Sequence, residues 1–188
     1  MATKISSGLT LSTDYFMRNF YTNNRDAISK RSNFSNIELS YEDSRALSRA
    51  AKRLIRSDYG SSEEEDLDID DTTKASIEAF VKTYNNALET GNTDDHDTKR
   101  YLSQLKNLSK KYSDELEDIG ISIEKNGSLS INDDLLKMAD TSKVKKIFSS
   151  DNDFSTKVLS ISKKLGQAVQ NNIFSEETGQ GLHINITL

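Results

Sequence analysis

Two acidic stretches of the sequence carry residue types that bind metal ions. In the first, Asp66, Asp68 and Asp70 stand at alternate positions, and alternate carboxylates can wrap a hard cation such as calcium. A calcium loop of that kind also needs a glycine at its sixth position and a bidentate glutamate at its twelfth. This chain has Asp71 and Ile77 at those positions, so we interpret the run as a solvated acidic segment.

The second acidic cluster surrounds a histidine. Asp94, Asp95, His96 and Asp97 are adjacent in the sequence, and adjacent side chains diverge around the start of a helix. Carboxylates at that place interact favourably with the positive end of the helix dipole. The cluster therefore indicates the cap of a helix, and we expect no metal and no cofactor in this chain.

Groups for catalysis are scarce. The sequence contains no Cys, Trp or Pro, and its two histidines, His96 and His183, have no convincing catalytic partner. The lack of cysteine excludes thiolate and zinc-finger chemistry. No nucleophile, base and orienting group can be assembled from the remaining residues. We therefore expect a protein that is not an enzyme.

Composition favours an elongated helical protein. Hydrophobic residues make up 34% of the chain, which is low for a compact globule, whereas helices packed side by side need only narrow apolar stripes. No apolar run approaches the length of a membrane span, so we expect no membrane insertion. The net charge of -5 argues against a dedicated nucleic-acid binder, and we interpret the basic segment Arg45–Arg56 as a solvated helix face.

The stretch 121–131 predicts a β-hairpin. Apolar and polar residues alternate in two short runs, 121–123 and 129–131, which Asn126 and Gly127 join. Asn-Gly is the strongest short-range signal for a two-residue hairpin turn, because both residues tolerate positive φ angles. The hairpin has one apolar face, and we expect the helical segments on either side to support it.

Helical periodicity predicts the other elements. An aromatic cluster near the N-terminus indicates local core packing: Tyr15, Phe16, Phe20 and Tyr21. We expect helices over 41–57, with Ser40 and Asp43 as a capping box, over 73–90, over 98–118 and over 154–173, and two short ones beginning near 132 and 141. The apolar stripes of 98–118 and 154–173 repeat at nearly heptad spacing, so these helices should pack as an antiparallel pair.

The expected fold class is mainly α: an elongated antiparallel helical bundle or coiled coil with a small β-hairpin and short covering helices. We divide the chain into an N-terminal helical segment (1–60), an acidic linker (61–71) and a helical coiled-coil domain with the hairpin (72–188). The last residues, 182–188, alternate like a half-buried strand, which should pair with the hairpin, the N-terminal segment or another subunit.

Ten residues are expected to matter most for structure or for interactions. They are apolar or aromatic members of the helical stripes and the turn residues beside the hairpin: Phe80, Tyr84, Leu105, Tyr112, Gly120, Asn126, Gly127, Phe148, Val158 and Leu165.

Three blocks of residues follow one another in a characteristic order. They are Ile77–Leu88, which contains Phe-Val and Tyr-Asn pairs, then Leu116–Ile123 leading into Lys125–Leu135, and finally Val144–Ser149. Together they resemble the C-terminal region of the bacterial flagellar filament-cap protein family (FliD, hook-associated protein 2), from about Thr73 to Phe174. The chain is much shorter than a full cap protein, which fits a truncated relative or a different protein that reuses the coiled coil and hairpin.

The resemblance implies an axial flagellar protein that passes unfolded through the flagellar export channel and resides in the extracellular flagellum. It implies a structural role through packing against flagellin-like subunits, or against further copies of itself in a homo-oligomer. The alternative is a cytoplasmic helical interaction module, such as an export chaperone or regulator. In either case the expected partners are proteins.

Overall fold

The computed structural model describes the chain apart from residues 1–6, 60–67, 92–94 and 181–188. Within the described part, nine α-helices, one short 3-10 helix and one two-stranded antiparallel sheet are formed. The elements in chain order are α1 (Ser7–Phe20), α2 (Asp26–Ser29), η1 (Arg31–Asn33), α3 (Asn36–Ile55), α4 (Asp71–Thr90), α5 (His96–Lys111), α6 (Ser113–Glu117), β1 (Ile121–Ile123), β2 (Leu129–Ile131), α7 (Asp133–Lys137), α8 (Thr141–Phe148) and α9 (Asp153–Gln180). The predicted fold class, a mainly helical bundle with a minor β-hairpin, is confirmed.

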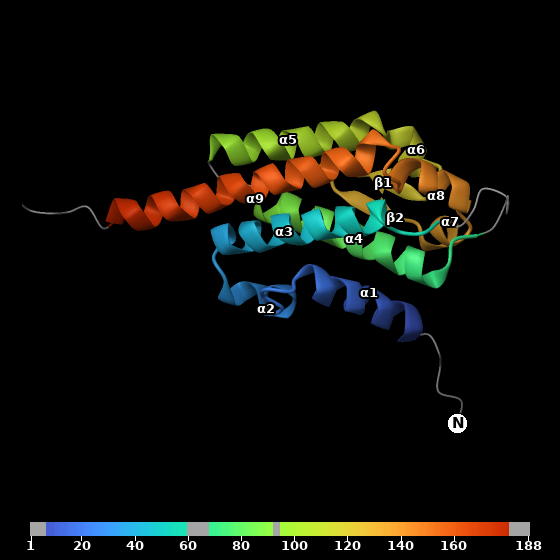
Figure 1. Ribbon diagram of the computed structural model, residues 1–188, viewed down its shortest axis with the longest axis horizontal. Coiled ribbons are helices and arrows are strands. Elements are labelled where there is room, and N and C mark those ends of the chain that lie inside the picture. Colours follow the sequence, from blue (N-terminus) through green and yellow to red (C-terminus); the bar gives the residue numbers. More distant parts are fainter. Residues whose placement is uncertain (1–6, 60–67, 92–94, 181–188) are drawn as a thin grey trace, which may run out of the picture.

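The long helices run roughly along the long axis of the molecule (Figure 1). α5 packs on α9, α9 packs on α3, and α3 packs on α4, while α1 contacts both α3 and α4. The hairpin gathers with α6, α7 and α8 at one end of the bundle (Figure 1). α9 packs on α5 as the predicted antiparallel pair, but its most extensive contact is with α3.

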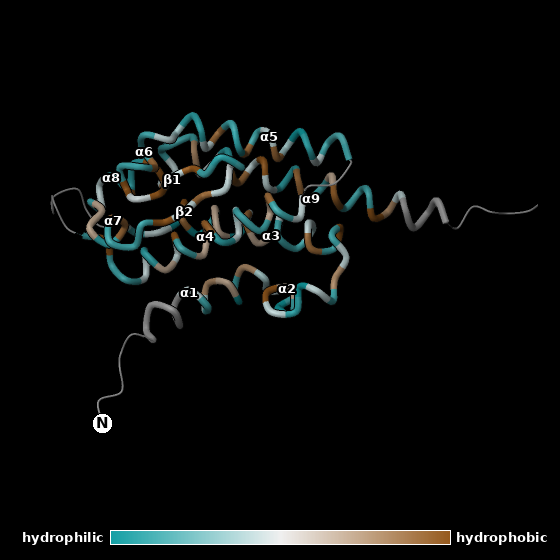
Figure 2. The backbone as a smooth tube through the Cα atoms, turned by 180° about the vertical axis from the view of Figure 1, so that it is seen from behind, coloured by the Kyte–Doolittle hydropathy of each residue, from teal (hydrophilic) through white to brown (hydrophobic). Residues whose placement is uncertain are grey.

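One continuous core joins the helices. Its buried apolar residues extend from Phe16 in α1 to Val169 in α9, and the hydrophobic positions of the tube face inward between the helices (Figure 2). The ring of Phe80 is fully buried in this core, with its centroid 5.6 Å from that of Phe148 and 6.3 Å from that of Phe154. Of the predicted N-terminal aromatic cluster, all but Tyr15 are buried.

The start of α3 differs from the prediction. The helix begins at Asn36, and its capping box consists of Ser35 and Glu38 instead of Ser40 and Asp43. The hydroxyl of Ser35 accepts the backbone N–H of Glu38, and the carboxylate of Glu38 accepts the N–H of Ser35 at 2.8 Å. Glutamate reaches back to the cap residue more easily than the shorter aspartate. Ser40 and Asp43 are buried further along the helix.

The helix expected over 98–118 is interrupted at Tyr112, which separates α5 from α6. The backbone N–H of Tyr112 donates to the carbonyls of Leu108 and Ser109, and its ring lies 5.5 Å from that of Phe154 in α9. Periodicity continues through this point, so the sequence pattern contains no sign of the break. The break instead coincides with the packing of the Tyr112 ring against Phe154 of α9.

The two strands form over the predicted residues, but the turn is one residue longer than predicted, so that Ile123 pairs with Leu129 and not with Ser130 as a two-residue turn at Asn126-Gly127 would require. The N–H of Gly127 donates to the carbonyl of Glu124 at 2.8 Å, and the N–H of Glu124 donates to the carbonyl of Ser128 at 2.8 Å. Residues 125–127 therefore form a three-residue loop. Gly127 has a φ of 89°, which is the left-handed position that closes such a loop as a bulge.

Substitution of Gly127 by valine should lower the free energy of unfolding by about 1–3 kcal/mol, because a β-branched residue is strained at positive φ. Gly127→Asn is the matched control, since its Cβ meets the same Lys106 side chain while asparagine tolerates the left-handed conformation. Chemical denaturation of both variants measures the difference. Equal losses would show that contact with Lys106, and not the backbone angle, sets the cost.

The hairpin lies against α4 and the short helices, as expected. The side-chain amide of Asn85 donates to the carbonyl of Leu129 and accepts its N–H, both at 2.8 Å, so it pairs with β2 as a neighbouring peptide would. On the other side, Gly120 has a φ of 79°, and a Cβ there would lie 2.8 Å from the backbone nitrogen of Leu136. These contacts fix the hairpin to the helical body.

Two predicted segments fall wholly or partly outside the described residues. Of the acidic linker, residues 60–67 are not described, but Ile69 is already buried in the core and Asp70 caps α4. The core includes helices from both sides of this stretch, and the division into three parts stays a prediction. The strand predicted for 182–188 lies outside the described residues.

Candidate functional site

The ten residues singled out from the sequence are mostly core residues. Apart from Asn126, which is exposed in the hairpin loop, each of them is buried. Phe80, Tyr84 and Phe148 lie in the central aromatic cluster, and Tyr112 packs against that cluster. The hydroxyl of Ser109 donates to that of Tyr84 at 2.8 Å, and burial raises the pKa of Tyr84 to about 12. These residues therefore stabilise the fold, and a binding surface must consist of other residues.

The acidic cluster before α5 acts as a helix cap, as predicted. A carboxylate oxygen of Asp95 accepts the backbone N–H of Thr98 at 2.7 Å, and Asp94 lies outside the described residues. The imidazole of His96 is 90% exposed. Across the described part of the chain, no group of three or more His, Cys, Asp and Glu side chains is placed to hold a metal ion.

A buried polar cluster centres on Asp43, whose side chain is inaccessible to solvent. Its carboxylate accepts two N–H groups of Arg31 at 2.9 and 3.0 Å, the Tyr21 hydroxyl at 2.6 Å and the Thr90 hydroxyl at 2.7 Å. Burial and the negative charge of Asp43 raise the pKa of the Tyr21 hydroxyl, while donation to Asp43 raises that of Arg31. All of these hydrogen bonds are made within the protein. Through Asp43 of α3 they join the segment before α3, which contains Tyr21 and Arg31, to Thr90 of α4.

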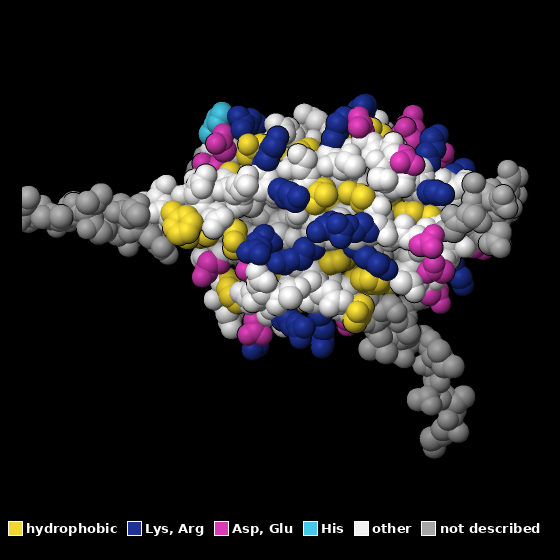
Figure 3. Space-filling model, in the orientation of Figure 1, with side chains coloured by type: hydrophobic (Ala, Val, Ile, Leu, Met, Phe, Trp, Pro, Cys, Tyr) yellow, Lys and Arg dark blue, Asp and Glu magenta, His cyan; other side chains and the backbone are white. Residues whose placement is uncertain are grey.

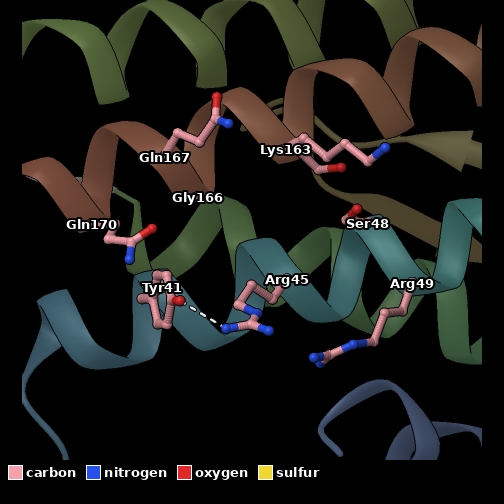
Figure 4. Close-up of a pocket in the computed structure, with 9 residues that line it drawn as sticks. Tyr41, Arg45, Ser48, Arg49, Lys163, Gly166, Gln167 and Gln170 are labelled. Carbon is pink, nitrogen blue, oxygen red and sulfur yellow. Dashed lines mark hydrogen bonds between the residues drawn. The ribbon is translucent and has the colours of Figure 1, made fainter. Parts of the chain in front are cut away.

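A groove of about 410 Å³ lies between α3 and α9 on the outer face of the molecule. Its walls come from successive turns of the two helices: Tyr41, Arg45, Ser48 and Arg49 of α3, and Ser162, Lys163, Gly166, Gln167 and Gln170 of α9 (Figure 4). These residues include three cations and no carboxylate. We therefore take this groove as the candidate site.

Small residues let the two helices approach closely beside the groove. A Cβ on Gly166 would lie only 2.8 Å from the hydroxyl oxygen of Ser44, and both residues are buried. The buried Ser162 lies one helical turn before Gly166. Close packing at this seam keeps the longer side chains of the walls outside it, where they face solvent.

Intramolecular bonds hold both arginines of the groove. The guanidinium of Arg45 donates to the hydroxyl of Tyr41 at 2.7 Å and lies 5.2 Å from the centre of that ring (Figure 4). Arg49 donates to the carbonyl oxygen of Phe20. Because a guanidinium has five N–H donors, each arginine keeps further donors for a ligand.

The groove is electrostatically positive. Burial, and to a smaller extent the nearby positive charge of Arg45, lowers the pKa of Arg49. The nearby carboxyl of Glu42 is partly buried, and burial raises its pKa. Its charge partly offsets that of Arg45 and Arg49, which act to lower the pKa of Glu42. Within the described residues Glu42 forms no ion pair with either arginine, so the groove lining keeps an excess of positive charge.

Further cations extend the groove along α3. We use the term cationic face for Arg45, Arg49 and Lys52 of α3 and Arg56 at its C-cap, together with Lys163 of α9. Lysine and arginine side chains gather over these two helices in the centre of Figure 3. The basic segment was visible in the sequence, where we interpreted it as solvated. The place of Lys163 beside it depends on the α3–α9 contact, which periodicity does not reveal.

Comparison of the chain with models of known families, with curated proteins and with solved structures found no match. None of the helices described by the structure is both long enough and apolar enough to span a membrane.

Proposed function

We propose that this chain is a non-catalytic structural protein that assembles with other protein subunits, as its resemblance to the flagellar filament-cap family implies. The observation that carries the proposal is the end of α9. In Figure 1 this helix continues beyond the ends of α3 and α5, up to Gln180. A helix that leaves its own bundle offers a surface that a helix of another subunit can cover.

The side chains of this projecting part support the proposal. Phe174 is 55% exposed, whereas Leu165 and Val169, earlier on the same helix, are buried in the bundle. Exposed aromatic groups of this size are typical of protein–protein contacts, where they bury a large apolar area with little loss of conformational freedom. Phe174 is thus more exposed than the apolar residues that precede it on α9.

The packing of the three resembling blocks also supports the proposal. The first block lies in α4, the second contains the hairpin and the third lies in α8. Phe80 of the first block packs against Phe148 of the third, and Asn85 of the first binds Leu129 of the second. The blocks therefore form one folded module, which is what a shared structural role would need.

Measurement of mass in solution tests the proposal. We expect the full chain to associate with itself or with purified flagellin as concentration rises, and Phe174→Asp to weaken that association at least tenfold. Ser160→Asp, which adds the same charge at an exposed position earlier on α9, should leave it within twofold. An inert monomer at every concentration, with or without flagellin, would contradict the proposal.

Cell fractionation tests the expected location separately. Recovery of the protein outside the cell, dependent on the flagellar export system, would support an axial role. A strictly cytosolic pool would instead favour the alternative of an export chaperone or regulator.

A further inference from the structure

The cationic face gathers five cations around α3 and α9, of which Arg45 and Arg49 also donate to the hydroxyl of Tyr41 and to the carbonyl of Phe20. Among the described residues, none of its five cations forms an ion pair, whereas Arg31 binds Asp43, and Lys74 lies 2.9 Å from Glu78 and 3.3 Å from Asp133. The whole chain has a net charge of -5, so this local excess of positive charge runs against the overall balance. Uncompensated charge on one face attracts an oppositely charged ligand.

The cations on α3 follow the helical repeat. Arg45, Arg49, Lys52 and Arg56 are separated by four, three and four residues and so share one side of the helix. At 1.5 Å per residue the stripe is about 16 Å long. A partner helix with carboxylates at the same spacing would present one carboxylate for each cation.

The groove beside the stripe has donors for peptide groups as well as for carboxylates. Gln167 and Gln170 line its α9 wall, and Ser48 lies on the α3 wall between the two arginines (Figure 4). The bond to Tyr41 orients Arg45 before any ligand arrives, which lowers the conformational entropy lost on binding. This combination suits a polypeptide that carries acidic side chains.

We propose that the cationic face binds an acidic segment of a partner protein, with carboxylates at helical spacing along α3 and its backbone or polar groups against the groove. The inference rests on the proposed function in one respect, that the partner is a protein. Individual exposed ion pairs are weak, so the affinity depends on several pairs together and decreases as salt rises.

A nucleic acid fits these observations less well. A stripe of about 16 Å faces only about five phosphates of one strand, at 3.4 Å per phosphate. The net charge of the chain repels a long polyanion, and the acidic residues 63–66 follow α3 closely in the sequence.

Fluorescence anisotropy with synthetic peptides tests the inference on the full chain. The probe is a labelled helical peptide of Ala, Gln and Leu with four glutamates spaced by four, three and four residues. A second peptide has the same composition with its glutamates at non-helical spacing. We expect the first peptide to bind at least fivefold more tightly than the second, and its Kd to rise with salt.

Charge-matched variants locate the site. Arg45→Gln with Arg49→Gln, and separately the more exposed pair Lys52→Gln with Arg56→Gln, should each raise the Kd of the first peptide at least fivefold. Lys110→Gln with Lys146→Gln removes the same charge from exposed positions on α5 and α8 and should change the Kd less than twofold. Circular dichroism establishes whether each variant is folded. If the Arg45/Arg49 variant does not fold, the Lys52/Arg56 variant still tests the inference.

Three outcomes would overturn the inference: equal binding of the two peptides, an equal effect of the control pair, or at least tenfold tighter binding of a single-stranded oligonucleotide than of the peptide. The result is separable from the proposed assembly role, because Phe174→Asp should leave peptide binding unchanged. If the chain binds the helically spaced peptide but never associates with flagellin or with itself, the proposal of an acidic partner stands. The proposal of an axial flagellar role is then wrong.

Discussion

Replacement of Asp43 by alanine should lower the free energy of unfolding by about 3–5 kcal/mol. The carboxylate is fully buried and accepts hydrogen bonds from Arg31, Tyr21 and Thr90. Its removal leaves the partly buried guanidinium of Arg31 without its ion pair and the buried hydroxyl of Tyr21 without its acceptor, while Thr90 keeps the carbonyl of Asn86 as an acceptor. Urea denaturation followed by circular dichroism measures the loss.

The control for this variant is Asp26→Ala. Asp26 also pairs with a cation, Lys30, at 3.2 Å, but both side chains are more than half exposed. Water can replace the hydrogen bonds of an exposed ion pair, so we expect the free energy of unfolding to change by no more than about 0.5 kcal/mol. If the two variants lost similar amounts of stability, the buried cluster would not be what attaches the segment before α3 to the bundle.

Replacement of Phe80 by alanine should cost about 3–5 kcal/mol, because the side chain is fully buried and its loss leaves a cavity that the neighbours fill only in part. Its ring contacts Tyr84 in the same helix, Phe148 in α8 and Phe154 in α9, so the cavity would open where three helices meet. The midpoint of urea denaturation should decrease accordingly.

Phe174→Ala removes the same ring from an exposed position and is the matched control. With 55% of that residue accessible, we expect its truncation to change stability by no more than about 0.5 kcal/mol. A loss as large as that of Phe80→Ala would mean that the end of α9 is packed more tightly within the monomer than the proposed assembly surface allows.

The hairpin shows which features of a fold can be predicted from residues close together in the sequence. Alternation over a few residues decides which side chains share a face, and Asn126 with Gly127 marks the place of the turn, so the bounds of the two strands followed from the sequence. The exact loop length did not, because Asn-Gly is compatible with a two-residue turn and with a three-residue loop closed by glycine. The hydrogen bonds of Glu124 decide between them.

The helix starts show a similar ambiguity. Ser40 with Asp43 and Ser35 with Glu38 both match the spacing of a capping box, and both precede apolar residues at helical spacing. Whether Asp43 caps a helix or accepts bonds from distant donors depends on what lies around it in the fold. Arg31, Tyr21 and Thr90 approach it only after α1, α3 and α4 have packed.

Sequence by itself determined the mainly helical class, the position of the hairpin and most of the buried stripes, because each depends on the periodicity of residues close together in the chain. Only the tertiary structure decided that α9 packs chiefly on α3, and so placed Lys163 beside Arg45 and Arg49. An apolar stripe indicates that one face of a helix is buried, but it does not indicate which other helix packs against that face. A site made by two helices far apart in the sequence therefore emerges only once they pack together.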